Sequence, residues 1–160
     1  MASAHPNELT RLMLLSIKPR HVNNILSGSK TVELRRIRPQ ISSGQPVAVY
    51  ATLPVAAVVA TCRVRAIDVA KPSTIKARHL DAAAVSTEEF DSYFAGSHQA
   101  VAIHLDDITV LETPVTLREI RTQCSAYNPP QTWHFFDRAQ LNYLFGPHRA
   151  HDDLSTLLVR

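Results

Sequence analysis

Two stretches near the start of the chain decide its fold: LLSIKP at residues 14–19 and GSKTVELRR at residues 28–36. The first completes an apolar run over residues 12–17, which predicts a buried strand, and its proline suits the first position of a helix. Gly28 opens the second stretch and supplies the left-handed residue that commonly ends a helix. We therefore predict a strand, one short helix and a sharp exit into the next element.

The residues after this helix alternate between the two faces of a strand predicted over residues 31–35. Positions 32 and 34 are apolar, whereas Thr31, Glu33 and Arg35 are polar. Because side chains alternate along a strand, we expect these three polar groups to share one face. Arg36 falls on the other side.

The rest of the chain predicts several short elements separated by turns. Alternating segments predict strands at residues 47–52, 55–67 and 99–105. Capping-box signatures predict helices after Ser86, Thr116 and Asp137. Strands interrupted by short helices, without the regular alternation of a doubly wound sheet, indicate an α+β fold with a mixed, mostly antiparallel β-barrel and short flanking helices.

The length of 160 residues and the 45% of hydrophobic residues favour one domain with its own core. We predict a disordered N-terminal segment at residues 1–10, the domain at 11–147, and a C-terminal helix or tail at 148–160. The start of the chain has no signal-peptide pattern, and no stretch approaches the roughly 18 apolar residues that a membrane span needs. A cytoplasmic protein without a membrane partner is therefore expected.

Neither the cysteines nor the histidines form a recognisable metal or redox motif. Cys62 and Cys124 are far apart in the sequence and are expected to be reduced thiols. The eight histidines lack the spacings of zinc sites, so we expect no metal and no cofactor. His21, on the first helix, is expected to face solvent.

Charge is unevenly distributed along the chain. Residues 18–38 carry six basic residues against one acidic residue, a net +5, whereas the remaining chain carries 11 basic and 13 acidic residues. A local basic cluster on a slightly acidic body is typical of a protein that contacts phosphate at one place. A solvated charged face without a partner is the alternative.

Taken together, the strand ending in Ser16-Ile17-Lys18-Pro19, the short helix, and Gly28-Ser29-Lys30-Thr31 with Glu33 and Arg35 resemble the opening of an ASCH domain. The segment Val47 to Thr52, followed by Pro54, is similar to the next strand of that family. A phosphate-binding P-loop is excluded, because Gly28 ends a helix and a strand follows Lys30, whereas a P-loop needs the reverse order.

The resemblance implies a PUA-like β-barrel that binds RNA or a modified nucleotide. Some relatives are enzymes, either amidohydrolases acting on acetylated cytidine or ribonucleases, and the fold does not choose between binding and hydrolysis. In the amidohydrolase type, the K-T lysine matches Lys30, but a threonine stands where this chain has Glu33. A regulatory protein that binds DNA through a partner domain is a third possibility, although no helix-turn-helix pattern fits.

The candidate site residues have distinct expected roles. Lys30 is the activated group of an enzyme, with Glu33 as its charged neighbour; in a binding module Glu33 accepts a hydrogen bond from a base edge, or merely pairs with a neighbouring cation. Tyr50 and Trp133 are the aromatic candidates for stacking on an unpaired base. The expected partner is RNA, another single-stranded nucleic acid or a modified nucleoside. The full set of predicted binding residues is Ser16, Lys18, Lys30, Thr31, Glu33, Arg35, Arg36, Tyr50, Thr52 and Trp133.

Overall fold

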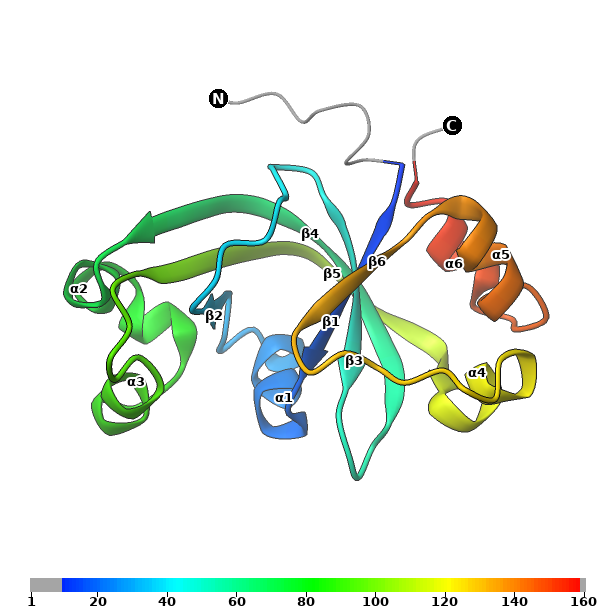
Figure 1. The fold of residues 1–160 in the computed structure, drawn as a ribbon, viewed down its shortest axis with the longest axis horizontal. Coiled ribbons are helices and arrows are strands. Elements are labelled where there is room, and N and C mark those ends of the chain that lie inside the picture. The colour runs from blue at the N-terminus through cyan, green and yellow to red at the C-terminus, as the bar shows by residue number, and fades with distance from the viewer. Residues whose placement is uncertain (1–9, 159–160) are drawn as a thin grey trace.

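The computed structural model describes residues 10–158, which form one curled sheet with helices at its two ends and one further helix near its middle (Figure 1). The strands are β1 (Leu12–Ile17), β2 (Val32–Arg35), β3 (Pro46–Ala51), β4 (Ala57–Ala70), β5 (Ala100–Thr116) and β6 (Trp133–Phe136). The helices are α1 (Pro19–Ser27), α2 (Pro72–Ala83), α3 (Thr87–Tyr93), α4 (Leu117–Gln123), α5 (Arg138–Phe145) and α6 (His151–Ser155).

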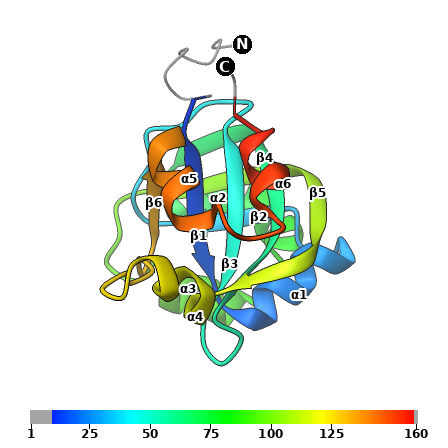
Figure 2. The same ribbon diagram turned by 90° about the vertical axis from the view of Figure 1, so that its right-hand side faces the viewer.

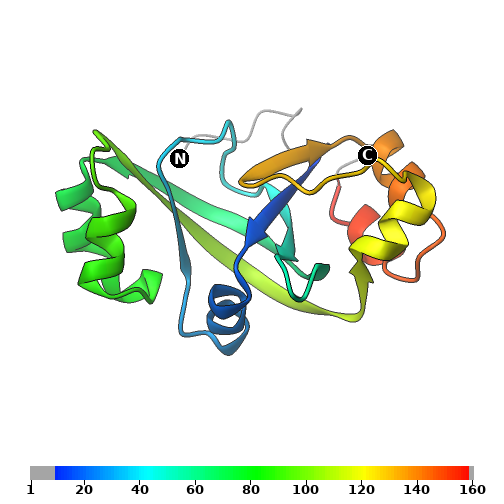
Figure 3. The ribbon, with the colours of Figure 1, turned by 60° about the horizontal axis from the view of Figure 1, so that its bottom comes forward.

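The sheet has six strands in the order β2-β5-β4-β3-β1-β6. Only β1 and β3 pair in parallel, and the other four pairings are antiparallel. Figure 3 shows the curl of the sheet, with α2 and α3 at one end and α4, α5 and α6 at the other. The predicted α+β fold with a mixed, mostly antiparallel barrel-type sheet is confirmed.

Each face of the sheet has its own hydrophobic cluster, because successive side chains of a strand point to opposite faces. Met13, Leu15 and Ile17 of β1 pack in an inner cluster with Val22 and Ile25 of α1. Their neighbours in β1 that face the other way pack in an outer cluster with α4, α5 and α6. A third cluster joins β2 and β5 to α2 and α3. The side chains of Val32 and Leu34 in β2 belong to this third cluster, so Glu33 and Arg35 lie on the opposite, inner face of the sheet.

Several elements differ from the predicted ones. Helix α2 was not predicted, because only Ile75 and Ala83 of its twelve residues are fully buried and its apolar pattern is weak. Strand β5 continues to Thr116, well past the predicted end at residue 105. Thr31 was expected on the strand with Glu33 but lies before β2 and is exposed.

The C-terminal segment is helical over α6 and packs on the outer cluster through Leu154 and Leu158. Residues 1–9 of the N-terminal segment predicted to be disordered lie outside the described residues. No helix in residues 10–158 has the length and apolar character that crossing a membrane requires.

Gly28 ends α1 in the left-handed conformation, with φ of 85° and its backbone N–H donated to Ile25 O. A β-carbon at this position would meet no atom within 4 Å, so the cost of a side chain is purely conformational. We expect Gly28→Ala to lower the free energy of unfolding by about 1 kcal/mol, and Gly28→Asn to cost less because asparagine tolerates this conformation. Urea unfolding of both variants checks the expectation, and equal losses for the two would contradict it.

Candidate functional site

Two charged side chains of β2, those of Glu33 and Arg35, are buried on the inner face of the sheet. They lie opposite Ile103 and Val101 of β5, which belong to the inner hydrophobic cluster. Glu33 is 7% exposed and Arg35 is 9% exposed. Burying a charge is costly unless it is paired and hydrogen-bonded, so the contacts of this pair decide what the site can do.

Arg35 connects the edge strand β2 to the end of β1. Its Nη2 donates to the backbone carbonyl of Ser16 at 2.9 Å and lies 3.9 Å from Glu33 Oε1. That carboxylate oxygen also accepts from the backbone N–H of Leu34 at 3.2 Å. One nitrogen of the guanidinium and one oxygen of the carboxylate are thus engaged within the protein.

Other buried polar atoms of the same region have no hydrogen-bond partner among the described residues. They are Glu33 Oε2, Arg35 Nε and His21 Nδ1, together with Ser16 Oγ, whose side chain lies on the opposite face of β1, the face of its register partner Tyr50. A buried donor or acceptor left unpaired costs about 1–3 kcal/mol. Each such atom needs a partner from ordered water or from a ligand, and the set includes one acceptor-only group and one donor-only group.

Lys30 lies next to this region and is 2% exposed. Its Nζ donates to the carbonyl oxygen of Ala83, the last residue of α2, at 2.7 Å. Burial lowers the pKa of Lys30, while the carboxylate of Glu33 opposes the shift and Arg35 adds to it. We call Ser16, His21, Lys30, Glu33 and Arg35 the polar cluster.

His21 belongs to the polar cluster although it was expected to face solvent. It is half-buried, and burial and then the charge of Lys30 lower its pKa, while Glu33 acts in the opposite direction. His21 directly precedes Val22, which packs inward, and this position next to the buried face of α1 was the only sequence feature that pointed to its partial burial. With a lowered pKa, His21 is neutral at pH 7 and offers one donor and one acceptor.

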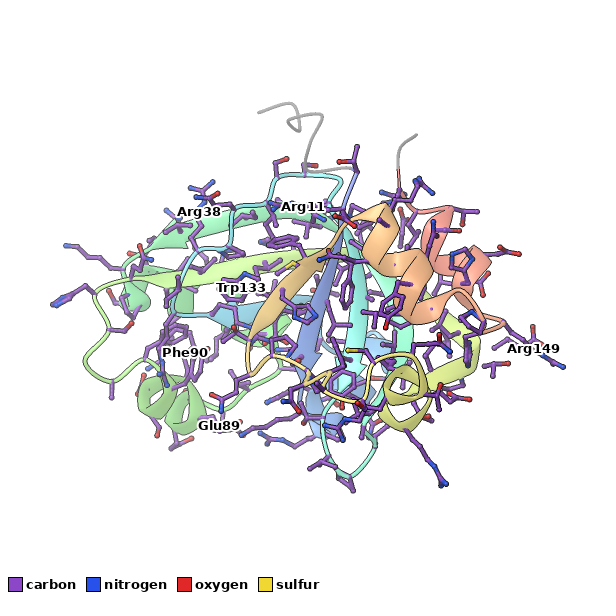
Figure 4. All side chains as sticks on the ribbon, turned by 45° about the vertical axis from the view of Figure 1, so that its right-hand side comes forward. Arg11, Arg38, Glu89, Phe90, Trp133 and Arg149 are labelled. Carbon is purple, nitrogen blue, oxygen red and sulfur yellow. The ribbon has the colours of Figure 1, made fainter. Side chains whose placement is uncertain are left out.

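An exposed ion pair closes one side of the polar cluster. Arg20 of α1 donates from both terminal nitrogens to Glu89 of α3, at 2.9 and 2.7 Å, and its Nη2 lies 3.4 Å from His21 Nε2. Glu89 is labelled on α3 in Figure 4. The pair connects α1 to α3 beside the cluster, and no pattern in the sequence predicts it.

The remaining predicted site residues lie around the polar cluster or apart from it. Lys18 is exposed and precedes α1, and Arg36 is also exposed and donates from Nε to Tyr93 O at 2.7 Å. Trp133, labelled in Figure 4, is partly buried against the inner hydrophobic cluster. Tyr50 is 3% exposed and packs in the outer cluster, so its ring has no face open to a base in this structure. Thr52 follows β3 and is half-buried.

Metal and thiol chemistry have no centre in the described part of the chain. No three side chains of the metal-ligating types come together there. Both cysteines are free, and burial raises the pKa of the Cys62 thiol to about 12, which keeps it protonated and unreactive.

Comparison with known proteins gives one curated relative and a group of solved structures. No family model matches the chain. The relative, described as an ASCH domain-containing ribonuclease from Zymomonas mobilis, is 31% identical over 122 residues, which cover 75% of this chain and 82% of the relative.

The crystal structure of ASCH from Zymomonas mobilis superposes with a TM-score of 0.77 at 27% identity, covering 84% of this chain and 94% of that one. A serine-to-alanine variant of that protein superposes with a TM-score of 0.78 at 26% identity, covering 88% and 97%. The N-terminal domain of Staphylothermus marinus McrB shares the fold alone, with a TM-score of 0.52 at 9% identity, covering 84% and 93%.

Proposed function

This chain belongs to the ASCH domain family, with a PUA-like fold, and we propose that it binds single-stranded RNA through its polar cluster. The observation that carries the proposal is the buried, unpaired set of Glu33 Oε2 and Arg35 Nε. A carboxylate that only accepts and a guanidinium that only donates complement the edge of an unpaired base, which presents donors and acceptors side by side.

A base explains the cluster better than a bare phosphate does. A phosphate presents only acceptors at its unprotonated oxygens, and a buried carboxylate facing it would repel it. Glu33 therefore favours a nucleotide whose base enters the cluster. The phosphates on either side would meet exposed cations near the site, of which Lys18 and Arg38 are examples. Trp133 supplies the ring for stacking.

Ribonuclease activity is the second candidate, and the description of the Zymomonas mobilis relative favours it. In the cleavage we propose, the 2′-hydroxyl gives its proton to a base and attacks phosphorus, the bond to the 5′-oxygen breaks, and that oxygen takes up a proton. Lys30 is the candidate for the activated group, because burial lowers its pKa and so raises the fraction of neutral amine that can take up the proton. Amide hydrolysis of acetylated cytidine remains the third candidate, with Glu33 in place of the threonine of that type.

Salt-dependent binding of RNA tests the proposal. We expect a fluorescein-labelled, single-stranded 20-mer to bind with an affinity that falls as salt rises, with a logarithmic slope of about −2 if three phosphates are neutralised. Fluorescence anisotropy measures the affinity, and the same oligomer as a duplex should bind more weakly because its bases are already paired. An affinity that changes neither with salt concentration nor between the single strand and the duplex would contradict the proposal.

Glu33→Gln changes the acceptor atom without changing the size of the side chain. The variant keeps one oxygen for the Leu34 N–H but replaces the free oxygen by a donor. We expect RNA affinity to fall about tenfold, the effect of losing one hydrogen bond to a charged group. Glu88→Gln on α3, where the side chain is exposed, is the matched control and should leave the affinity unchanged. Equal affinities for the two variants would remove Glu33 from the site.

A further inference from the structure

A pocket of about 470 Å³ lies on the side of the molecule that carries α4, outside the polar cluster. Its apolar surface comes from Val55, Ala56 and Leu117, and its positive charge comes from Arg118 and Arg121. Two threonines of the α4 segment complete the lining. The volume is that of a site for a small organic ligand. No residue of the polar cluster lines it.

The two arginines differ in how firmly they are held. Arg121 donates from Nε to Tyr127 O and from Nη2 to Asn128 Oδ1, both at 3.0 Å, so its guanidinium has a fixed position. Arg118 is exposed and forms no ion pair with any described carboxylate. The carboxylate of Glu119, between them in sequence, accepts at Oε2 from the backbone N–H of Thr116 at 2.8 Å, so it lies beside a pocket residue and offsets one of the two positive charges. The pocket therefore keeps a net positive charge.

The apolar part of the pocket continues into exposed aliphatic side chains. Leu53 is 78% exposed and Val55 is 47% exposed, both in the turn between β3 and β4. Aliphatic surface next to a free guanidinium is a combination that suits a nucleotide, since the sugar or base covers the apolar part while the phosphate meets the cation.

The turn between β3 and β4 lies between the pocket and the end of β1 that receives Arg35. Thr52 N–H donates to Ile17 O at 3.0 Å, and Leu117 N–H donates to Ala56 O at 2.9 Å, so the turn after β3 touches both β1 and α4. Figures 1 and 2 both show this turn at one end of the molecule, with α1 on one side of it and α4 on the other. One extended chain passing over the turn would reach both places.

Ser16 contributes to both faces of the sheet. Its carbonyl receives Arg35, but its side chain points to the same face as Tyr50, its register partner in β3. The field of Arg121 reaches Tyr50, where it lowers the pKa against the larger, raising effect of burial. The unpaired, buried hydroxyl of Ser16 is thus on the pocket side of the polar cluster.

We propose that this pocket is a second subsite, which holds the sugar and phosphate of a neighbouring nucleotide of the same RNA strand. The inference rests on the proposed RNA binding and extends it: the polar cluster takes one base, and the strand continues over Lys18 and Thr52 to Arg118 and Arg121. Because the two subsites lie on either side of the β3–β4 turn, only an oligonucleotide that spans the turn contacts both.

The test compares two RNA lengths and two matched variants. Arg118 and Lys71 are both exposed cations at the start of a helix, α4 and α2, and α2 lies at the opposite end of the molecule (Figure 1). Glutamate is favourable at either helix start, so Arg118→Glu and Lys71→Glu should both fold, which thermal unfolding verifies. Fluorescence anisotropy then measures the affinity of each protein for a labelled tetranucleotide and a labelled 12-mer.

We expect Arg118→Glu to weaken the 12-mer by about tenfold and to reduce its salt slope by about 0.7, the share of one phosphate contact on a single strand. The tetranucleotide should change by less than about twofold, as should both oligomers with Lys71→Glu. An unchanged 12-mer affinity, or an equal loss for both lengths, would overturn the subsite while leaving RNA binding in place. Failure of the unaltered protein to bind either oligomer would overturn the proposed function and the subsite together.

Discussion

Replacing Arg35 with methionine is expected to lower both the stability of the protein and its affinity for RNA. The change removes the donor to Ser16 O and the ion-pair partner of the buried carboxylate of Glu33. Breaking one partner of a buried pair costs about 3 kcal/mol in the free energy of unfolding, because the remaining charge is uncompensated. RNA affinity should fall at least about tenfold, since a hydrogen-bond donor and a positive charge leave the site together. Urea unfolding and anisotropy with single-stranded RNA measure the two effects.

The double variant Glu33→Gln with Arg35→Met separates the two effects. With the carboxylate neutralised, most of the lost stability should return, whereas RNA affinity should stay low because neither charged group is present. Arg78→Met is the matched surface control: its partner is Asp68 at 3.2 Å and its side chain is 56% exposed, so the loss should stay below about 1 kcal/mol. Recovery of RNA affinity in the double variant would show that Arg35 acts on the fold alone.

The sequence predicted the strand and helix that carry the site but not all of the residues that form it. Strand β1, helix α1 and the shared strand face of Glu33 and Arg35 follow from local periodicity and from the positions of Pro19 and Gly28, which act on nearby residues. His21 and the Arg20–Glu89 pair depend on where α3 comes to lie, and that position is fixed by contacts between segments far apart in the chain. Periodicity within one element carries no information of this kind.

Tyr50 and α2 show the same limit in two other ways. The alternation around Tyr50 was predicted, but which face of β3 would be covered by α4 and α5 depends on the curl of the whole sheet. Helix α2 has a weak apolar pattern of its own, and its position is nevertheless essential to the site, because its last carbonyl holds Lys30. Sequence patterns indicate what an element is, whereas the contacts of the folded chain decide what it meets.

Lys30→Met is expected to separate catalysis from folding, if the chain cleaves RNA. Methionine fills similar space without a charge, so the gain from removing a buried ammonium should offset the loss of the bond to Ala83 O to within about 1 kcal/mol. Cleavage of single-stranded RNA should fall at least about a hundredfold, the usual effect of losing an acid–base group, while binding changes little. Gel analysis of labelled RNA and urea unfolding at pH 7 measure the two quantities, with Lys76→Met, a surface lysine paired with Asp91, as control.

The pH dependence of stability identifies the buried ammonium independently of activity. The pKa of Lys30 in the folded protein is lowered from its ordinary value of 10.5, so between the two values the unfolded chain binds more protons. The contribution of Lys30 to the free energy of unfolding therefore increases as pH rises through that window. Below the window Lys30 is charged in the folded protein, and the full cost of burying that charge lowers the stability. Burial raises the pKa of Tyr50 and of Cys62 in both proteins alike, so the difference in the free energy of unfolding between the unaltered protein and Lys30→Met isolates the lysine. A difference that stays constant from pH 7 to 10 would show that Lys30 keeps an ordinary pKa, and a protonated ammonium held by Ala83 would then be a structural support rather than the activated group.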